Sequence, residues 1–339
     1  MRLAIDAMGG DDAPRSMVLG AWDYAQAYPA HSVLLVGRES DIRPCLPAGP
    51  LANIEIIHAP EVIGMADKLS ALKEKPNDSM NRCAQLVKKG EADGMVLCGN
   101  TGCSVGVAQL HLRRIPGVKR AGILTPLPKS TGGHSWVCDC GANAVGKPEH
   151  LVQFGEMTSA FLQVTQNKPR PGVGVLSIGE EDEKGDDLTA ETLALLRKTE
   201  LNVLGNVEGH DIFSRADLDV IICDGFTGNV LLKASEGLEK ALRTVIREEI
   251  MRGFWTRIGA LLTRPAFARV RRRLDWRYVG GCVLLGVDGV CIIGHGRSDR
   301  VAVFHALKQA ALCVDAQVVP VLRKHFCNAA GSETGSPTA

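Results

Sequence analysis

Short apolar segments alternate with helix-like segments along most of the chain, and this alternation constrains the fold more than any other feature. Each strand-like segment is bounded by glycine or polar residues. These segments cover residues 2–6, 32–37, 53–59, 94–98, 172–179 and 218–224. Continuous apolar strands that alternate with helices are typical of a mostly parallel sheet that is covered on both faces. The sequence therefore predicts an α/β fold.

Composition supports a large aliphatic core. The chain has 339 residues, of which 45% are hydrophobic and only 4% aromatic. No run approaches the 18 apolar residues of a membrane-spanning helix, and the N-terminus does not resemble a signal peptide. Eleven cysteines contain no CxxC pair, which indicates reduced, mostly buried thiols. We therefore expect a cytoplasmic protein, and we expect neither a metal site nor a cofactor.

The alternation stops between residues 230 and 277. Residues 230–253 predict one long helix, and residues 254–276 predict further helices that are broken near Pro265. Two short strands joined by a tight turn at Asp288-Gly289 follow, and then a closing helix over 298–325. We expect one domain over residues 1–327, with a basic helical segment at about 235–277, and a disordered tail over 328–339.

One strand–turn–helix junction occurs twice. "ADGMVLCGNTG" (92–102) aligns with "LDVIICDGFTGN" (218–229), so that Asp93, Gly99, Thr101 and Gly102 match Asp219, Gly225, Thr227 and Gly228. The two threonine hydroxyls suit either helix capping or contact with a phosphate oxygen. Our hypothesis is that both turns approach one anionic ligand from two sides of the sheet's crevice.

Five glycine-rich loops follow strand-like segments, at 6–14, 99–102, 139–143, 178–185 and 224–229. Such loops present backbone N–H groups at the ends of strands, where α/β proteins bind anions. Asn100 and Asn229 can donate amide hydrogens to an oxyanion or a phosphate without titrating. The candidate phosphate- or substrate-binding residues in these loops, besides Asn229, are Asp6, Gly9, Gly10, Asn100, Thr101, Gly102, Asn143, Asp224, Gly225, Thr227 and Gly228.

Two further residues carry charge or titrate near these loops. Lys184 follows four acidic residues in "EEDEKGDD" and is either a solvated charge or a group that neutralises phosphate. His295 lies between glycines after a strand and is either structural or part of the site. Walker and strand-linked GxGxxG patterns are absent from the sequence, which argues against a P-loop and a dinucleotide site.

Residues 251–277 contain eight arginines and one acidic residue, a net charge of 8 − 1 = +7 in a chain of net charge +1. A solvated helical face or a dimer contact would explain this segment, and so would docking of an acidic carrier protein. Nucleic-acid binding is not expected, because no helix-turn-helix or aromatic platform accompanies the charge. We favour docking on a membrane surface. Its apolar side comprises Phe254, Trp255, Ile258, Leu261 and Leu262, flanked by Arg257, Arg264 and Arg269.

The motifs together resemble one family over residues 1–325, in the family's order. "DAMGGDDAP", "GNTG", "DCGAN", "IGEEDEKG", "GNVEGHDI", "CDGFTGNVLLK" and "LLGVDGVCIIGHGRSD" are similar to the successive motifs of the bacterial phosphate acyltransferases (PlsX). The chain departs from the family pattern at Cys103, Cys140, Ser177 and Arg215, where Ala, Val, Asn and Gly are common. These departures concern acyl-donor preference more than phosphate binding.

The resemblance implies reversible transfer of a long-chain fatty acyl group from acyl carrier protein to inorganic phosphate, for glycerophospholipid synthesis. It also implies a Rossmann-like three-layer α/β/α fold of the isocitrate and isopropylmalate dehydrogenase type with a helical protrusion. A homodimer, peripheral attachment to the inner face of the cell membrane and a downstream glycerol-3-phosphate acyltransferase are implied as well.

Phosphate itself would be the nucleophile, so the mechanism requires no nucleophile from the protein. We expect Lys184 to offset phosphate or transition-state charge and Asn229 to donate to the oxyanion or the phosphate. Two alternatives stay open: an acyl-CoA-dependent phosphotransacetylase-like enzyme, and a non-catalytic membrane-associated scaffold. A dehydrogenase on the same fold is disfavoured by the missing dinucleotide fingerprint.

Overall fold

A computed structural model describes residues 1–49 and 51–332 of the chain. The strands are β1 Arg2–Asp6, β2 Ser32–Gly37, β3 Ile54–His58, β4 Gly94–Leu97, β5 Gly122–Pro128, β6 His134–Cys138, β7 Gly172–Leu176, β8 Asn202–Val207, β9 Leu218–Ile222, β10 Cys282–Leu285 and β11 Val290–Ile293. The helices are α1 Arg15–Ala27, α2 Glu39–Ile42, α3 Ala71–Glu74, α4 Ser79–Lys88, α5 Thr101–His111, α6 Pro148–Gln166, α7 Asp187–Leu196, α8 Asp211–Ser214, α9 Gly225–Arg252, α10 Phe254–Leu274, α11 Arg300–Asp315 and α12 Val318–Ser332. Two 3₁₀ turns, at Arg43–Cys45 and Trp276–Tyr278, complete the described elements.

The strands form one 11-stranded sheet in the order β3-β2-β1-β4-β11-β10-β5-β6-β9-β7-β8. Seven of its ten described pairings are parallel, and the three antiparallel ones are β11–β10, β10–β5 and β5–β6 at its centre. The expected mostly parallel α/β sheet is therefore confirmed. Two of the antiparallel pairings arise because β10 and β11, which are late in the sequence, insert between β4 and β5, and the third joins the consecutive strands β5 and β6.

Helices cover both faces of the sheet, because the strands bury side chains on both sides. Leu3 and Ile5 of β1 enter one hydrophobic cluster, together with residues of α1, α6 and α11. Ala4, between them, enters a second cluster with residues of α4 and α5. Alternate residues of one strand point to opposite faces, so this division gives the three-layer arrangement that we expected.

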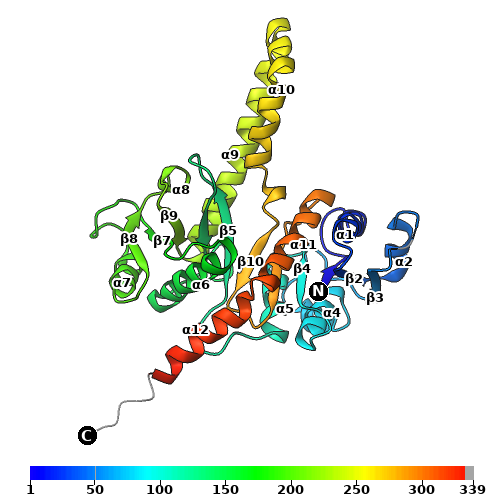
Figure 1. Cartoon of the computed structure of the whole chain (residues 1–339), viewed down its shortest axis with the longest axis horizontal. Helices are drawn as coiled ribbons and strands as arrows, with labels where there is room; N and C mark the ends of the chain where they lie inside the picture. The colour runs from blue at the N-terminus through cyan, green and yellow to red at the C-terminus, as the bar shows by residue number, and fades with distance from the viewer. Residues whose placement is uncertain (50, 333–339) are drawn as a thin grey trace.

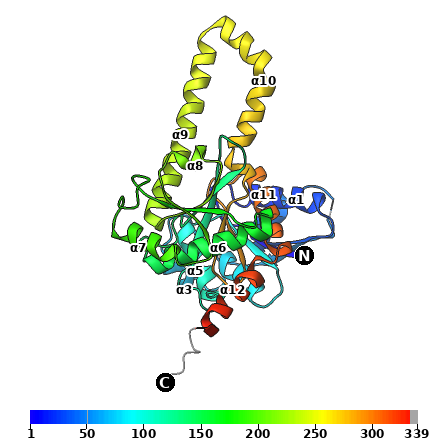
Figure 2. The ribbon, with the colours of Figure 1, turned by 60° about the vertical axis from the view of Figure 1, so that its left-hand side comes forward.

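Helices α9 and α10 form an arm that projects far from the rest of the molecule (Figures 1 and 2). They meet at Gly253 near the tip of the arm, and the second view shows the two helices apart along much of its length. The expected break near Pro265 does not occur, since α10 runs through it. Proline removes one helical N–H donor, and this loss is tolerated here because the helix around Pro265 is exposed to water.

Three further differences concern the strands and the C-terminal part. Strands β5, β6 and β8 were not expected from the apolar pattern. The expected closing helix is two helices, α11 and α12, because Gln317 between them adopts a left-handed conformation with φ 51°. Helix α12 continues to Ser332, five residues into the expected tail. The rest of that tail, residues 333–339, lies outside the described residues.

Candidate active site

The loops that the sequence assigns to one anion site lie in two groups. Loops 6–14 and 99–102 follow the neighbouring strands β1 and β4, whereas loops 139–143, 178–185 and 224–229 follow β6, β7 and β9. Four strands separate β4 from β9, which corresponds to on the order of 24 Å of sheet. Thr101 and Thr227 therefore do not enclose one phosphate between them. The hypothesis of a shared ligand is not met, because β11, β10, β5 and β6 separate the two junctions.

In the first group, β1 ends on a buried carboxyl group. Asp6 is 1% exposed and accepts a hydrogen bond from the backbone N–H of Met8 at 3.0 Å. Burial raises the pKa of Asp6 to about 6. Gly9 lies against the second loop of the group, since a Cβ atom there would be 2.9 Å from the backbone nitrogen of Gly99. The next residue, Gly10, adopts φ 104°.

Asn100 organises the first turn of α5. Its Oδ1 accepts a hydrogen bond from the N–H of Cys103 at 3.1 Å. Its Nδ2 donates to the carbonyl oxygens of Met65 at 2.9 Å and Asp67 at 3.2 Å. The amide of Asn100 is therefore used within the protein, in contrast to the expected role as a phosphate donor. Thr101 and Gly102 are exposed, and their N–H groups have no acceptor among the described residues.

His295 connects the first group to α9. Its Nε2 lies 3.4 Å from Nζ of Lys233 and 3.7 Å from Oε2 of Glu236. Its Nδ1 accepts a hydrogen bond from the N–H of Arg297 at 3.1 Å. The hydrogen bond from His295 lowers the pKa of Glu236. The sequence did not identify Lys233 and Glu236, although Lys233 lies four residues after Asn229 and so on the same face of α9.

In the second group, the backbone donors of loop 139–143 are occupied by the chain's own carboxylate. Asp139 is fully buried and accepts hydrogen bonds from the N–H groups of Ile123, Gly141, Ala142 and Asn143 at 2.7–3.0 Å. Burial raises its pKa. Nδ2 of Asn143 donates to Asp139 at 2.9 Å and to the carbonyl of Ala121 at 2.7 Å. Asn143 therefore shapes this loop and does not present a free amide to phosphate, contrary to its expected role.

The N-terminus of α9 is also internally satisfied. Asp224 accepts hydrogen bonds from the N–H groups of Phe226 and Thr227 at 2.9 and 3.0 Å, and from the Thr227 hydroxyl at 2.6 Å. Gly225 donates its N–H to the carbonyl of Asn143 at 2.9 Å. Gly228 lies directly on loop 139–143, because a Cβ atom there would be 1.9 Å from the carbonyl oxygen of Asp139. Asp224 is the N-cap of α9, and the Thr227 hydroxyl donates to this capping carboxylate.

Lys184 is exposed on a loop whose backbone is fixed by hydrogen bonds from neighbouring side chains. The carbonyl of Lys184 accepts hydrogen bonds from the Ser177 hydroxyl and from Nδ2 of Asn206, each at 3.2 Å. Asn206, which is 2% exposed on β8, also donates to the carbonyl of Glu181 at 2.8 Å. Gly185 completes the loop with φ 107°, a conformation that favours glycine. The Lys184 ammonium group itself has no ion-pair or hydrogen-bond partner in the described part of the chain.

Asn229 lies one turn into α9 and is exposed. Its amide lies next to Gly141, at 3.6 Å from the position of a Cβ atom there, and it makes no hydrogen bond with the described residues. Lys184 and Asn229 thus differ from Asn100, Asn143 and Thr227. Their polar groups remain available to a ligand.

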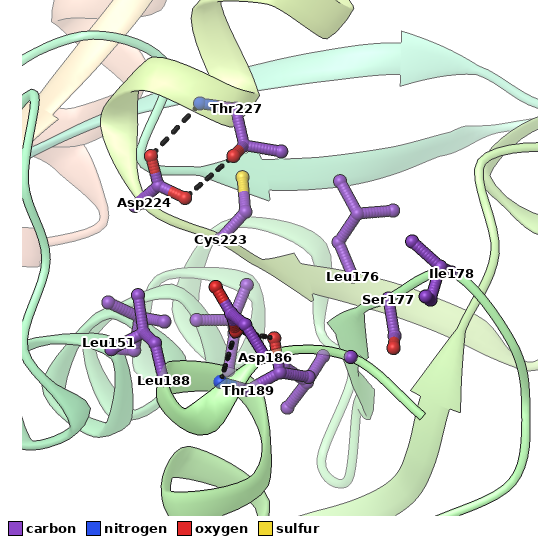
Figure 3. Close-up of a pocket in the computed structure, with 13 residues that line it drawn as sticks. Leu151, Leu176, Ser177, Ile178, Asp186, Leu188, Thr189, Cys223, Asp224 and Thr227 are labelled. Carbon is purple, nitrogen blue, oxygen red and sulfur yellow. Dashed lines mark hydrogen bonds between the residues drawn. The ribbon is translucent and has the colours of Figure 1, made fainter. Parts of the chain in front are cut away.

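A cavity of about 370 Å³ lies between these two residues' loops (Figure 3). Gly185 and Asp186 line it next to Lys184, and Asp224 and Thr227 line it near Asn229. The remaining lining residues are Leu151, Val175, Leu176, Ser177, Ile178, Leu188, Thr189, Ile222 and Cys223. The second loop group therefore combines a cavity, a free cation and a free amide donor.

Comparison with known proteins identifies the family. Residues 1–321 match the family model described as "Fatty acid synthesis protein". The phosphate acyltransferase of Polynucleobacter asymbioticus is 43% identical over 312 residues, which are 91% of this chain and 92% of the relative. That of Myxococcus xanthus is 42% identical over 335 residues, which are 97% of this chain and 95% of the relative. The chain belongs to the phosphate acyltransferase family.

Solved structures agree on the fold of this acyltransferase. A phosphotransacetylase from Streptococcus pyogenes matches with a TM-score of 0.61 and 15% identity, over 94% of each chain. A 4-hydroxythreonine-4-phosphate dehydrogenase from Klebsiella pneumoniae matches with a TM-score of 0.56 and 11% identity, over 93% of this chain and 99% of that chain. At these identities the likeness concerns the fold alone, and it confirms the expected dehydrogenase-like architecture.

The arm of the acyltransferase exposes most of the residues that the sequence assigns to a membrane surface. Trp255, Leu261 and Leu262 are 79%, 68% and 76% exposed, and Ile258 is 37% exposed. Arg264 is exposed, whereas Arg257 donates from Nε and Nη2 to the carbonyl of Met251 at 3.0 and 2.6 Å. Arg257 thus caps the end of α9. None of the helices in residues 1–49 and 51–332 combines the length and the hydropathy that a membrane span requires.

Proposed function

We propose that the acyltransferase transfers a long-chain fatty acyl group from acyl carrier protein to inorganic phosphate, and that the acyl phosphate serves glycerophospholipid synthesis. The observation that carries this proposal is the selective availability of Lys184 and Asn229. The polar groups around them are used within the protein, whereas these two side chains keep their donors free. Their chain neighbours Gly185 and Thr227 line the cavity. The family membership supports phosphate as the acyl acceptor.

The chemistry needs an anion holder and an oxyanion donor. Phosphate attacks the thioester carbonyl, the carbonyl oxygen acquires negative charge, and the carrier's thiolate leaves. The ammonium group of Lys184 attracts phosphate and offsets this charge, and the amide of Asn229 donates to the oxyanion. A thiol with a pKa of about 8.5 is a sufficient leaving group without a strong general acid.

A covalent acyl-cysteine intermediate has no support at this site. Cys140 lies within the second loop group and Cys223 directly precedes one of its loops, and both thiols are buried. Burial raises the pKa of both thiols above their ordinary value. Because the thiolate is the nucleophilic form, these cysteines are poor nucleophiles. Phosphate can therefore act as the direct nucleophile.

The activity is tested by trapping acyl phosphate with hydroxylamine. Hexadecanoyl acyl carrier protein and hexadecanoyl-CoA are each supplied with inorganic phosphate, and we expect product from the carrier protein. Product from acyl-CoA alone would contradict the proposed donor and favour a phosphotransacetylase-like enzyme. No product from either donor, with a folded protein, would overturn the proposal.

The roles of the two residues are tested by Lys184→Ala and Asn229→Ala. Loss of an oxyanion donor costs on the order of 10²–10³ in rate, and we expect kcat to fall in this range for Asn229→Ala. Lys198→Ala, on an exposed lysine beyond α7, and Lys240→Ala, on α9, are the matched controls. Near-normal turnover of either active-site variant would remove that residue from the mechanism.

We further propose that the arm attaches the enzyme peripherally to the inner face of the cell membrane, with the rest of the molecule in the cytoplasm. The exposed tryptophan and leucines supply an apolar surface, and each nearby arginine adds roughly 1 kcal/mol on anionic lipid. Trp255→Asp combined with Leu261→Asp should abolish flotation with vesicles that contain phosphatidylglycerol. Leu312→Asp, on the exposed surface of α11, is the control. Flotation that persists in the double variant would contradict membrane docking.

The same arm supports a homodimer. Leu238, Leu242 and Val245 of α9 are 61%, 53% and 55% exposed and follow the i, i+4, i+7 spacing of one helical face. Such a face, which no residue of 1–49 or 51–332 covers, fits a second copy of the chain. Leu238→Asp with Leu242→Asp should convert a dimer to a monomer in sedimentation, whereas Leu312→Asp should not. A monomeric wild-type protein would exclude this proposal.

We also propose that the acyl phosphate is delivered to a glycerol-3-phosphate acyltransferase at the membrane, because an acyl phosphate is an activated donor from which an alcohol can accept the acyl group. The test is glycerolipid formation by vesicles that contain such an acyltransferase, supplied with the proposed enzyme and acyl carrier protein. We expect the product to require both enzymes. Product formed without this protein would contradict its place before that step.

A further inference from the structure

The cavity beside Lys184 and Asn229 is walled mainly by aliphatic side chains. They come from two helices, two strands and one loop, so the cavity depends on the folded structure and not on one loop. The aliphatic residues are Leu151 of α6, Val175 and Leu176 of β7, Ile178 of the following loop, Leu188 of α7 and Ile222 of β9. We call this space the aliphatic cavity.

The polar groups around the aliphatic cavity already have partners within the protein, as the dashed lines in Figure 3 show for two of them. Asp186 accepts hydrogen bonds from the N–H and the hydroxyl of Thr189, at 2.9 and 2.7 Å. Asp224 accepts from the N–H and the hydroxyl of Thr227. Oδ1 of Asp186 accepts both of its bonds, and Oδ2 has no partner among the described residues but belongs to an exposed side chain. Apart from this oxygen, these carboxylate oxygens are paired, so an apolar ligand loses little by entering along the aliphatic wall.

Two further polar residues that line the cavity, Ser177 and Cys223, also have partners within the protein. Ser177 donates its hydroxyl to the carbonyl of Lys184, and the Cys223 thiol lies 3.6 Å from the carbonyl oxygen of Asp139. Burial raises the pKa of Cys223, so its thiol adds no charge to the wall. The affinity of this space must therefore come chiefly from burying aliphatic surface.

Size and position define the occupant. A water molecule occupies about 30 Å³ and a methylene group has a similar size, so about 370 Å³ holds on the order of a dozen such groups. Gly185 and Thr227 line the cavity, which places its polar rim beside Lys184 and close to Asn229. A chain whose carbonyl carbon lies at these two residues can enter the cavity directly.

We propose that the aliphatic cavity receives the methylene chain of the acyl donor and sets the preference for chain length. This inference rests on the proposed function, because it takes Lys184 and Asn229 as the site of the thioester carbonyl. Each buried methylene contributes about a fourfold gain in affinity, so a hexadecanoyl chain should be strongly favoured over an octanoyl chain.

The test narrows the cavity and compares two chain lengths. Leu188 is half-buried at its wall, and Leu188→Phe reduces its volume. We expect kcat/KM for hexadecanoyl acyl carrier protein to fall tenfold or more, while that for the octanoyl donor changes less than about threefold. Leu195→Phe, on the same helix but outside the cavity and 37% exposed, should change neither value. Equal losses for both chains, or no loss for either, would overturn the inference.

A second variant covers the case in which Leu188→Phe does not fold. Ile178 is 80% exposed at the cavity, so Ile178→Trp narrows the entrance without disturbing the core. We expect it to reproduce the chain-length effect, and circular dichroism checks that both proteins are folded. An unchanged ratio of the two kcat/KM values in a folded Ile178→Trp variant would also overturn the inference.

Binding of hexadecanoate and octanoate, measured by calorimetry, separates the inference from the proposed function. If wild type binds hexadecanoate and Leu188→Phe or Ile178→Trp weakens this binding tenfold, the cavity assignment holds even where no acyl phosphate forms. If acyl phosphate forms but neither binding nor turnover responds to these substitutions, the proposed function stands and the cavity assignment fails.

Discussion

The two strand–turn–helix junctions have matching aspartate, glycine and threonine residues, but they cap their helices differently. At the first junction the neutral Asn100 caps α5, and Thr101 is the first helical residue with an exposed side chain. At the second junction the anionic Asp224 caps α9, and Thr227 lies in the third helical position, bonded to that cap. A carboxylate at the N-terminus compensates the helix dipole, whereas a neutral amide does not. Similar sequences therefore produce one internally neutralised helix end and one that keeps its positive potential.

The matching aspartates differ as much as the caps. Asp93 lies at the surface before β4 and accepts one hydrogen bond, from the N–H of Arg2 at 2.7 Å. Asp219 lies in β9, is 7% exposed, and pairs with Lys168 and with the buried Lys129. The aspartate of the second junction is thus buried and ion-paired in the sheet, whereas that of the first junction lies at the surface. The surroundings of these aspartates are therefore determined by the position of each junction in the sheet more than by the shared sequence motif.

The largest difference should appear when these aspartates are removed. Asp219→Ala leaves the ammonium group of Lys129, whose side chain is 4% exposed, without its buried counter-charge. Breaking a buried pair costs about 3–5 kcal/mol of unfolding free energy, whereas the exposed Asp93→Ala should cost less than about 1 kcal/mol. Urea denaturation measures both values, and Asp219→Asn is the conservative control. Similar losses at the two positions would refute the comparison.

The next largest effect concerns the free energy of unfolding, which should depend on pH because of Asp6, beside the first junction. Burial raises its pKa from 3.8 to about 6, so the folded state binds more protons than the unfolded chain between these values. The free energy of unfolding should therefore fall as pH rises from about 4 to 6, by on the order of 3 kcal/mol. Asp6→Asn should remove this contribution, as urea denaturation across the same pH range would show. An unchanged slope in the variant would mean that other groups cause it.

Replacing the two matching glycines, Gly102 and Gly228, by alanine should give a smaller difference in the free energy of unfolding. At Gly228 the new Cβ atom would lie 1.9 Å from the carbonyl oxygen of Asp139, so α9 must move away from its loop. We expect Gly228→Ala to cost about 1–3 kcal/mol or more. At Gly102 the nearest atom is Oδ1 of Asn100 at 3.3 Å, and the change should stay within about 0.5 kcal/mol. Thermal or urea unfolding that ranks them in the opposite order would contradict the contacts described here.

These contrasts show which parts of the fold the sequence can predict. Apolar runs such as residues 2–6 and 32–37 identified β1 and β2, because continuous burial on two faces leaves a local signal. Strand β5 was missed since "GILTPLP" contains two prolines, and β8 was missed since Gly205 interrupts "NVLGNV". The insertion of β10 and β11 between β4 and β5 depends on contacts distant in sequence. Local patterns do not determine such a strand order.

The same limit applies to the candidate site. The sequence selected Lys184 and Asn229, and the structure leaves both side chains free, because charged or polar residues in glycine-rich loops carry a local signal. It did not select Asp139, although that residue lies in the motif "DCGAN" and takes the hydrogen bonds expected for a phosphate. Nor did it select Asn206, whose signal was an amide within an apolar strand that burial obliges to find partners. Which donors are already used is a property of the folded structure.

The smallest difference in stability is expected from removing the hydroxyls of Thr101 and Thr227. This comparison distinguishes a structural role from contact with phosphate. Thr227→Val removes the hydrogen bond to Asp224 at 2.6 Å and should cost about 1 kcal/mol of unfolding free energy. The Thr101 hydroxyl is exposed and has no partner among the described residues, so Thr101→Val should leave stability within about 0.5 kcal/mol. Urea denaturation tests both, and the KM for phosphate distinguishes a substrate role from a structural one. If Thr101→Val raises that KM while stability is unchanged, the first junction contacts phosphate independently of the second; if neither value moves, only the helix end capped by Asp224 uses its threonine.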